Sequence, residues 1–241
     1  GYEIAMDEDD AFAIATRKLM ADYDGLNHVA HLGSETKAIV QFQKVADLQL
    51  TNQHSLTSIM TLYDITLNVS TRPGQSKKNL QRFRPASDVI GRLYSENVLF
   101  WDALRLSVPA IDSVLQSNPA EEKVKSLGVR HKGGGHVLFR PAGQKAFSKA
   151  VQRMVARDFT IESATRVLAD TEMELDQPPW RGTLWDSSAE KMKPQGARLH
   201  YNLFLYMAGE PVDNPNYDLL REYRKATGDQ RAALPSVMVR R

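Results

Sequence analysis

The sequence predicts an α/β protein that is mainly helical, with a few short strands forming a small sheet or hairpin. Apolar residues recur at helical spacing in the longer segments, whereas short apolar runs beside glycine or proline indicate strands. The chain has 241 residues, of which 42% are hydrophobic, a composition typical of a globular protein. We therefore expect one module over residues 1–241. The alternative is a division into a helical part, residues 1–126, and a strand-helix part with a Trp-bearing hairpin, residues 127–241.

Helices are expected over three segments of the first half, residues 7–23, 54–70 and 85–116. The first begins with a run of acidic residues, which complement the positive end of the helix dipole. The second carries apolar side chains three and four positions apart, which indicates a helix packed on the core. The third continues in the same pattern up to Pro109, which should break or restart it.

The second half alternates short strands with helices. The run HVLFR, residues 136–140, follows three glycines and predicts a short strand. The motif PPWRGTLWD, residues 178–186, predicts a strand or hairpin whose two tryptophans either pack on the core or stack on a nucleobase. Helices are expected over residues 141–159 and 160–172, in the hydrophobic segment that ends at Gly209, and in the amphipathic tail 216–235.

Composition excludes several classes of protein. The absence of cysteine excludes disulfides, thiolate nucleophiles and cysteine-ligated metal clusters, and it agrees with a cytoplasmic location. The histidines lack metal-ligand spacing, and no nucleophile elbow, metalloprotease helix motif or calcium-binding loop occurs. No apolar run is long enough to span a membrane. We therefore assign no catalytic residue, metal, cofactor or membrane partner.

The positive charges are unevenly distributed along the chain, although the net charge is only +2. Residues 123–157 contain nine Lys or Arg and no acid, and residues 72–84 contain five and none. Such segregation predicts a basic face of the kind that binds nucleic acid. The candidate contacts are Arg72, Lys77, Lys78, Arg82, Arg84, Arg130, His131, Lys132, Arg140, Lys145, Lys149, Arg153 and Arg157.

Three consecutive glycines, residues 133–135, lie within the longer basic segment. A Walker-type phosphate loop would place its lysine after the glycines, and here Lys132 comes before them. Two interpretations remain open. The glycines either form a flexible loop that leads into an edge strand, or they let the main chain approach a phosphate backbone and offer its N–H groups.

Four cations recur every four residues along the predicted helix 141–159: Lys145, Lys149, Arg153 and Arg157. This spacing places them on one helix face. A solvated surface stripe is the alternative to a phosphate-binding face. In the shorter basic segment, Phe83 either stacks on a base or anchors its loop to the core.

Several motifs of the chain resemble the C-terminal portion of the DGQHR-domain family, which includes the regulatory protein of bacterial DNA phosphorothioation operons. The motifs are DEDDAFAIATRKL, HSLTSIMTLYDI, VLFWDAL, GGGHVLFRPAGQKAFSKAV, PPWRGTLWDSSAEKM and YNLFLYMAGE. The Asp-Gly-Gln-His-Arg motif itself is absent, so the chain is expected to be a fragment or module without the N-terminal half of such proteins. The resemblance implies a role in a DNA-modification or defence system and DNA-binding transcriptional control.

The charge pattern and the resemblance together predict a DNA-binding regulatory module of a bacterial phosphorothioation-like or defence system, in which the basic surface contacts DNA. The first alternative is a protein-interaction module of such a system, with other proteins of the system as partners and apolar helices such as YNLFLYMAG as contacts. The second is the non-catalytic part of a nucleotide-using or nuclease enzyme. The oligomeric state has no signal in the sequence.

Overall fold

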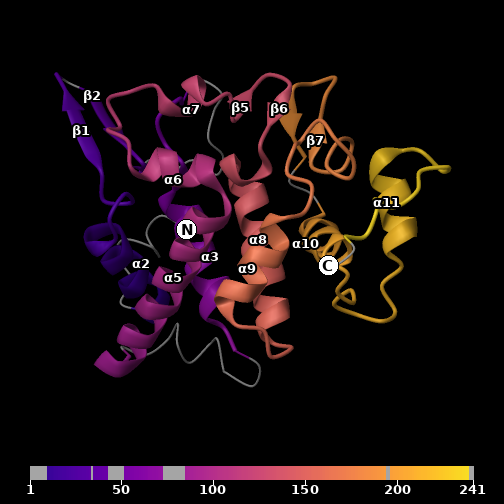
Figure 1. The fold of residues 1–241 in the computed structure, drawn as a ribbon, viewed down its shortest axis with the longest axis horizontal. Coiled ribbons are helices and arrows are strands. Elements are labelled where there is room, and N and C mark those ends of the chain that lie inside the picture. The colour runs from indigo at the N-terminus through magenta and orange to yellow at the C-terminus, as the bar shows by residue number, and fades with distance from the viewer. Residues whose placement is uncertain (1–9, 34, 43–51, 73–84, 194–195, 239–241) are drawn as a thin grey trace.

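Helices predominate in the computed structural model, which describes residues 10–33, 35–42, 52–72, 85–193 and 196–238. The prediction of a mainly helical α/β fold is confirmed (Figure 1). The helices are α2 (Ala11–Asp22), α3 (Ile59–Ser70), α5 (Ser87–Ser107), α6 (Pro109–Leu115), α7 (Lys123–Ser126), α8 (Pro141–Val155), α9 (Ile161–Ala169), α10 (Ala197–Met207) and α11 (Leu219–Thr227).

Within the residues that the structure describes, the strands form short two-stranded sheets. Three of these sheets are antiparallel: β1 (Val29–Leu32) with β2 (Glu35–Ala38), β5 (Arg130–His131) with β6 (Gly134–Gly135), and β7 (Trp185–Asp186) with β8 (Lys191–Met192). The fourth is parallel and joins β3 (Val40–Gln41) to β4 (Thr57–Ser58). Figure 1 shows β1, β2, β5, β6 and β7 at one end of the helices.

Local signals in the sequence set several helix boundaries. The Asp10 carboxylate accepts hydrogen bonds from the backbone N–H groups of Phe12 and Ala13, which begins α2. Pro109 separates α5 from α6 and occupies the first turn of α6, where its missing N–H costs nothing. The Thr160 hydroxyl caps α9 by accepting from Ser163 N–H. These boundaries agree with the expected helices.

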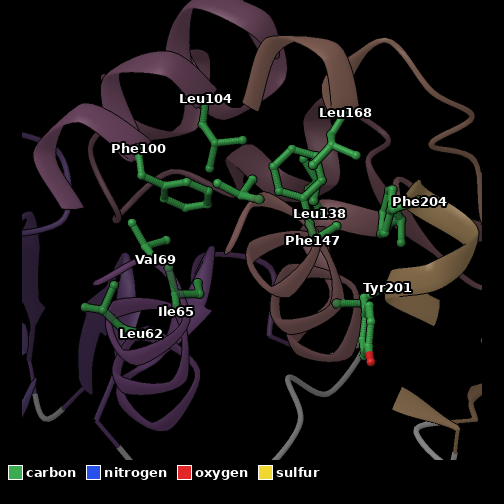
Figure 2. Packing of buried hydrophobic residues seen from close by; sticks show 14 of the residues in the cluster. Leu62, Ile65, Val69, Phe100, Leu104, Leu138, Phe147, Leu168, Tyr201 and Phe204 are labelled. Atoms are coloured by element: carbon green, nitrogen blue, oxygen red, sulfur yellow. The ribbon is translucent and has the colours of Figure 1, made fainter. Parts of the chain in front are cut away.

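The core is continuous from the first half of the chain to the second. Phe147 of α8 lies at its centre, with its ring centroid 6.3 Å from that of Phe100 on α5 and 5.4 Å from that of Phe204 on α10 (Figure 2). Helix α3 packs against α8, and α5 packs against α9. Buried side chains on both sides of the suggested boundary at residue 126 therefore belong to one hydrophobic cluster.

The predicted strand over residues 136–140 is wrong. Val137–Phe139 instead forms a short 3-10 helix, and the His136 side chain caps it by accepting from Leu138 N–H. A short apolar run has no periodicity that distinguishes a strand from a helical turn. The nearby polar acceptor and the proline that begins α8 decide the outcome here.

The expected Trp-bearing hairpin is present around Trp185, whereas Trp180 lies in the turn before it. Trp185 of β7 pairs with Met192 of β8. The Trp180 ring packs 4.5 Å from the Phe204 ring, centroid to centroid, and both tryptophan side chains are fully buried. Their rings therefore pack on the core and are not placed to stack on a nucleobase.

Candidate nucleic-acid interface

The triple-glycine segment runs from the β5–β6 hairpin turn, which contains the exposed Gly133, into strand β6, which is formed by the buried Gly134 and Gly135. Gly135 has φ +81°, and a Cβ atom there would lie 2.4 Å from the carbonyl oxygen of Val129. Gly134 has φ +122°, and its carbonyl accepts from the Arg140 guanidinium. Both glycines thus permit close packing within the protein, and at Gly134 and Gly135 the main chain is covered and does not offer its N–H groups to a phosphate backbone.

Arg130 and Arg140 are both 2% exposed, so the structure removes them from the predicted basic surface. The Arg130 guanidinium donates to the carbonyls of Phe139, Asn52 and Ser55. Arg140 donates to the carbonyls of His131 and Gly134, and it lies over the Trp185 ring at 5.2 Å. A guanidinium has five N–H donors in a planar arrangement, so one arginine can hydrogen-bond several carbonyls that a lysine ammonium could not reach together. These arginines hold the hairpin against the core.

The four cations Lys145, Lys149, Arg153 and Arg157 are all partly buried. Acids from distant parts of the chain contact three of them, whereas Lys149 Nζ donates to Gln152 Oε1. Lys145 Nζ lies 3.7 Å from an Asp64 oxygen, Arg153 Nε lies 2.8 Å from Asp213, and Arg157 Nη1 lies 3.8 Å from Glu210. The predicted basic face is therefore partly paired with carboxylates. The absence of Asp and Glu from residues 123–157 did not reveal these contacts, because the acids come from other segments that fold against α8.

Arg153 and Arg157 fasten the segment that follows α10 onto α8. Asp213, which pairs with Arg153, also accepts from the Tyr201 hydroxyl at 3.0 Å. Arg157 donates to the Pro211 carbonyl at 2.8 Å. These contacts give the two arginines a structural role in the isolated chain.

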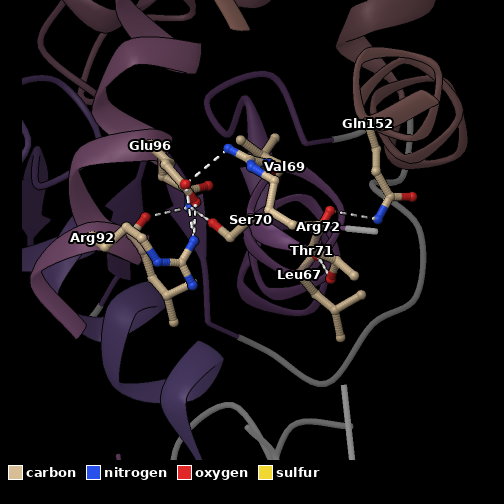
Figure 3. A network of polar contacts seen from close by, with 10 residues as sticks. Leu67, Val69, Ser70, Thr71, Arg72, Arg92, Glu96 and Gln152 are labelled. Atoms are coloured by element: carbon tan, nitrogen blue, oxygen red, sulfur yellow. Dashed lines mark hydrogen bonds and ion pairs between the residues drawn. The ribbon is translucent and has the colours of Figure 1, made fainter. Parts of the chain in front are cut away.

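Arg72, two residues after the end of α3, belongs to a polar network between the end of α3 and α5 (Figure 3). Its guanidinium lies 2.8 Å from Glu96 and donates to the Val69 carbonyl, and Arg92 pairs with the same Glu96. His131 and Lys132 are exposed at the tip of the β5–β6 hairpin. The remaining predicted contacts, together with Phe83, lie outside the described residues: Lys77, Lys78, Arg82 and Arg84.

A pocket of about 300 Å³ lies between α3, α8 and α10. Lys145 and Lys149 line it, one turn apart on α8, and no carboxylate from the described residues is in its wall. The sequence predicted these two lysines and missed the rest of the wall, because α3 and α10 meet α8 only through tertiary packing. The other lining residues are Asn68, Ala142, Ala146, Ala197, His200 and Tyr201.

The polar side chains of the pocket wall have defined partners. The Asn68 amide donates to Ser148 Oγ at 3.1 Å and to the Lys145 carbonyl at 3.4 Å, which ties α3 to α8. His200 is 1% exposed, and burial lowers its pKa to about 4, so the ring is neutral at pH 7 and its Nε2 faces the Thr183 carbonyl at 3.2 Å. Burial, with the hydrogen bond to Asp213, raises the pKa of Tyr201. The formal charge in the pocket wall at pH 7 therefore comes from the two lysines.

Comparisons of the chain with protein-family models, with curated proteins and with solved structures find no match. Within the described ranges, no helix has both the length and the apolar composition needed to cross a membrane.

Proposed function

We propose that this chain is a DNA-binding regulatory module that contacts the phosphate backbone, with Lys145 and Lys149 of α8 as its principal contacts. One observation carries the proposal: two lysines one helical turn apart line an open pocket whose described wall contains no carboxylate. Ammonium groups so placed are suited to phosphate oxygens. The resemblance to DGQHR-domain proteins supports the further proposal that the DNA belongs to a bacterial modification or defence system.

Several cations that the sequence suggested as DNA contacts are buried or paired within the protein. Arg153 and Arg157 are held by carboxylate and carbonyl partners, and Arg130 and Arg140 are buried. His131 and Lys132 form a separate exposed pair on the hairpin tip and are secondary candidates. The pair Lys145 and Lys149 is therefore the first target for mutation.

Reversing the charge of both lysines, Lys145→Glu with Lys149→Glu, is expected to weaken DNA binding and to flatten its salt dependence. Each lost phosphate contact removes about 0.9 from the slope of log affinity against log salt, so two contacts remove about 1.8. Fluorescence anisotropy of a labelled duplex, titrated over a range of salt concentrations, measures both quantities.

The matched control is Lys125→Glu with Arg221→Glu, which changes the net charge equally at exposed positions outside the pocket. We expect the control to alter the slope far less than the pocket variant, because its side chains are not direct contacts. Equal slopes for the wild type and the pocket variant, with equal affinities, would contradict the proposal. Circular dichroism establishes that both variants are folded.

The protein-interaction alternative is favoured by a different observation. Leu106 is 84% exposed and Leu99 is 41% exposed, and their spacing places them on the same face of α5. The helix YNLFLYMAG cannot supply the apolar contact, since Leu203, Phe204 and Leu205 are buried. A pure chain that binds no DNA at low salt would favour this second function.

A further inference from the structure

We infer that the pocket between α3, α8 and α10 binds a phosphomonoester, the chemical group shared by the phosphorylated end of a nucleic-acid strand and a free mononucleotide. The inference deepens the proposed function and rests on it, because it names which phosphate the chain prefers. Three features of the pocket support it: its charge, the helix ends that reach it, and its size.

The charge of the wall suits a dianion. A phosphomonoester carries a charge of about −1.5 to −2 at pH 7, whereas an internal phosphodiester carries one negative charge. Lys145 and Lys149 provide two ammonium groups, and the neutral His200 ring adds no charge. Asp64 lies 3.7 Å from Lys145 but outside the lining, and at side-chain exposures of 41% and 46% this pair is weak. Lys145 can therefore turn toward an anion in the pocket.

Two helix N-termini reach the same pocket. Ala142 in the first turn of α8 and Ala197 at the start of α10 both line it. No side chain caps either helix in the described structure. In α10 the first helical hydrogen bond runs from His200 N–H to the Gly196 carbonyl. The backbone N–H groups before His200 therefore have no acceptor within the helix. Helix N-termini attract anions through these donors and the helix dipole, and here they add to the lysine charge.

Size and wall chemistry limit what can enter. A pocket of about 300 Å³ lies at the lower limit for small-molecule sites, which is enough for a phosphate and its attached sugar. The alanines Ala142, Ala146 and Ala197 keep it open, and the mainly apolar wall includes the Tyr201 ring. A DNA duplex is too wide to enter such a pocket, so internal phosphates can reach the partly exposed lysines only from outside it, and the group held inside belongs to a strand end or a free nucleotide.

The test compares phosphate and hydroxyl forms of the same ligands on the full chain. A short single-stranded oligonucleotide with a 5′-phosphate is expected to bind about tenfold more tightly than its 5′-hydroxyl form, the effect of one additional charge-assisted contact. Adenosine monophosphate and adenosine are the corresponding competitors. Competition by the monophosphate shows that free nucleotides share the site, whereas a phosphate preference confined to the oligonucleotide assigns the site to strand ends.

The variant Ala197→Leu locates the site, because it fills the pocket at an exposed position without changing a charge. We expect it to lose the phosphate preference and to keep the salt-dependent binding of the 5′-hydroxyl oligonucleotide. Ala189→Leu, also exposed and outside the lining, is the control and should keep the preference. Full preference in Ala197→Leu would overturn the inference.

The two proposals fail in different ways. Salt-dependent binding of DNA with no preference for either phosphorylated probe would overturn the phosphomonoester inference alone. An absence of DNA binding in the wild type at low salt would overturn the proposed function, and with it the inference.

Discussion

Replacing Gly135 with alanine is expected to lower the free energy of unfolding by about 4 kcal/mol, the sum of backbone strain and overpacking. Gly135 has φ +81°, and a Cβ atom there would lie 2.4 Å from the Val129 carbonyl oxygen and 3.1 Å from Arg130 Cα. Both neighbours are backbone atoms, so relief requires the β5–β6 hairpin to shift. Urea denaturation followed by circular dichroism measures the loss.

Alanine substitutions at two nearby glycines distinguish backbone strain from overpacking. Gly128 has φ +65°, and a Cβ atom there would meet no other atom within 4 Å, so Gly128→Ala should show backbone strain alone, about 1–2 kcal/mol. Gly133 does not have a positive φ, and a Cβ atom there would approach only the exposed His131 ring. Gly133→Ala should therefore change stability by about 0.5 kcal/mol or less. Similar small losses for all three variants would show that the hairpin does not need its glycines.

Acidification from pH 8 to pH 5 is expected to destabilise the protein by about 2 kcal/mol for each of two histidines, the partly buried His136 and the buried His200, at 1.36 kcal/mol per pKa unit. Burial lowers the pKa of both His136 and His200 to about 4, from an ordinary value of 6.5. Between these values the unfolded chain binds more protons than the folded one. Stability is therefore fully present above pH 6.5 and falls as the pH drops toward 4.

Conservative variants test whether the two histidines cause the loss of unfolding free energy at low pH. His136→Asn keeps an acceptor for Leu138 N–H, and His200→Gln keeps a donor for the Thr183 carbonyl. Each is expected to remove about half of the difference in unfolding free energy between pH 8 and pH 5, measured in urea. Glu174 acts in the opposite direction, since partial burial together with Asp176 and Glu172 raises its pKa. An unchanged pH dependence in the double variant would contradict the assignment.

The candidate site was only partly predictable. The basic stripe on α8 was visible because side chains four positions apart share a helix face, and Lys145 and Lys149 do line one pocket. Its acidic partners were not visible, since Asp64 lies on α3 and Asp213 follows α10. The sequence contained only one weak indication of the other pocket residues: His200 stands beside the hydrophobic run YNLFLYM. Nothing in the sequence pointed to Tyr201.

The sequence by itself determined the mainly helical fold, because helix periodicity, the Asp10 and Thr160 caps and the break at Pro109 depend on residues a few positions apart. Only the tertiary structure decided which cations face solvent. Arg130 is buried because it donates to the carbonyl of Asn52, 78 positions away, and to that of Ser55. Local spacing sets which face of a helix a side chain occupies, but whether that side chain stays exposed depends on distant segments that fold against it.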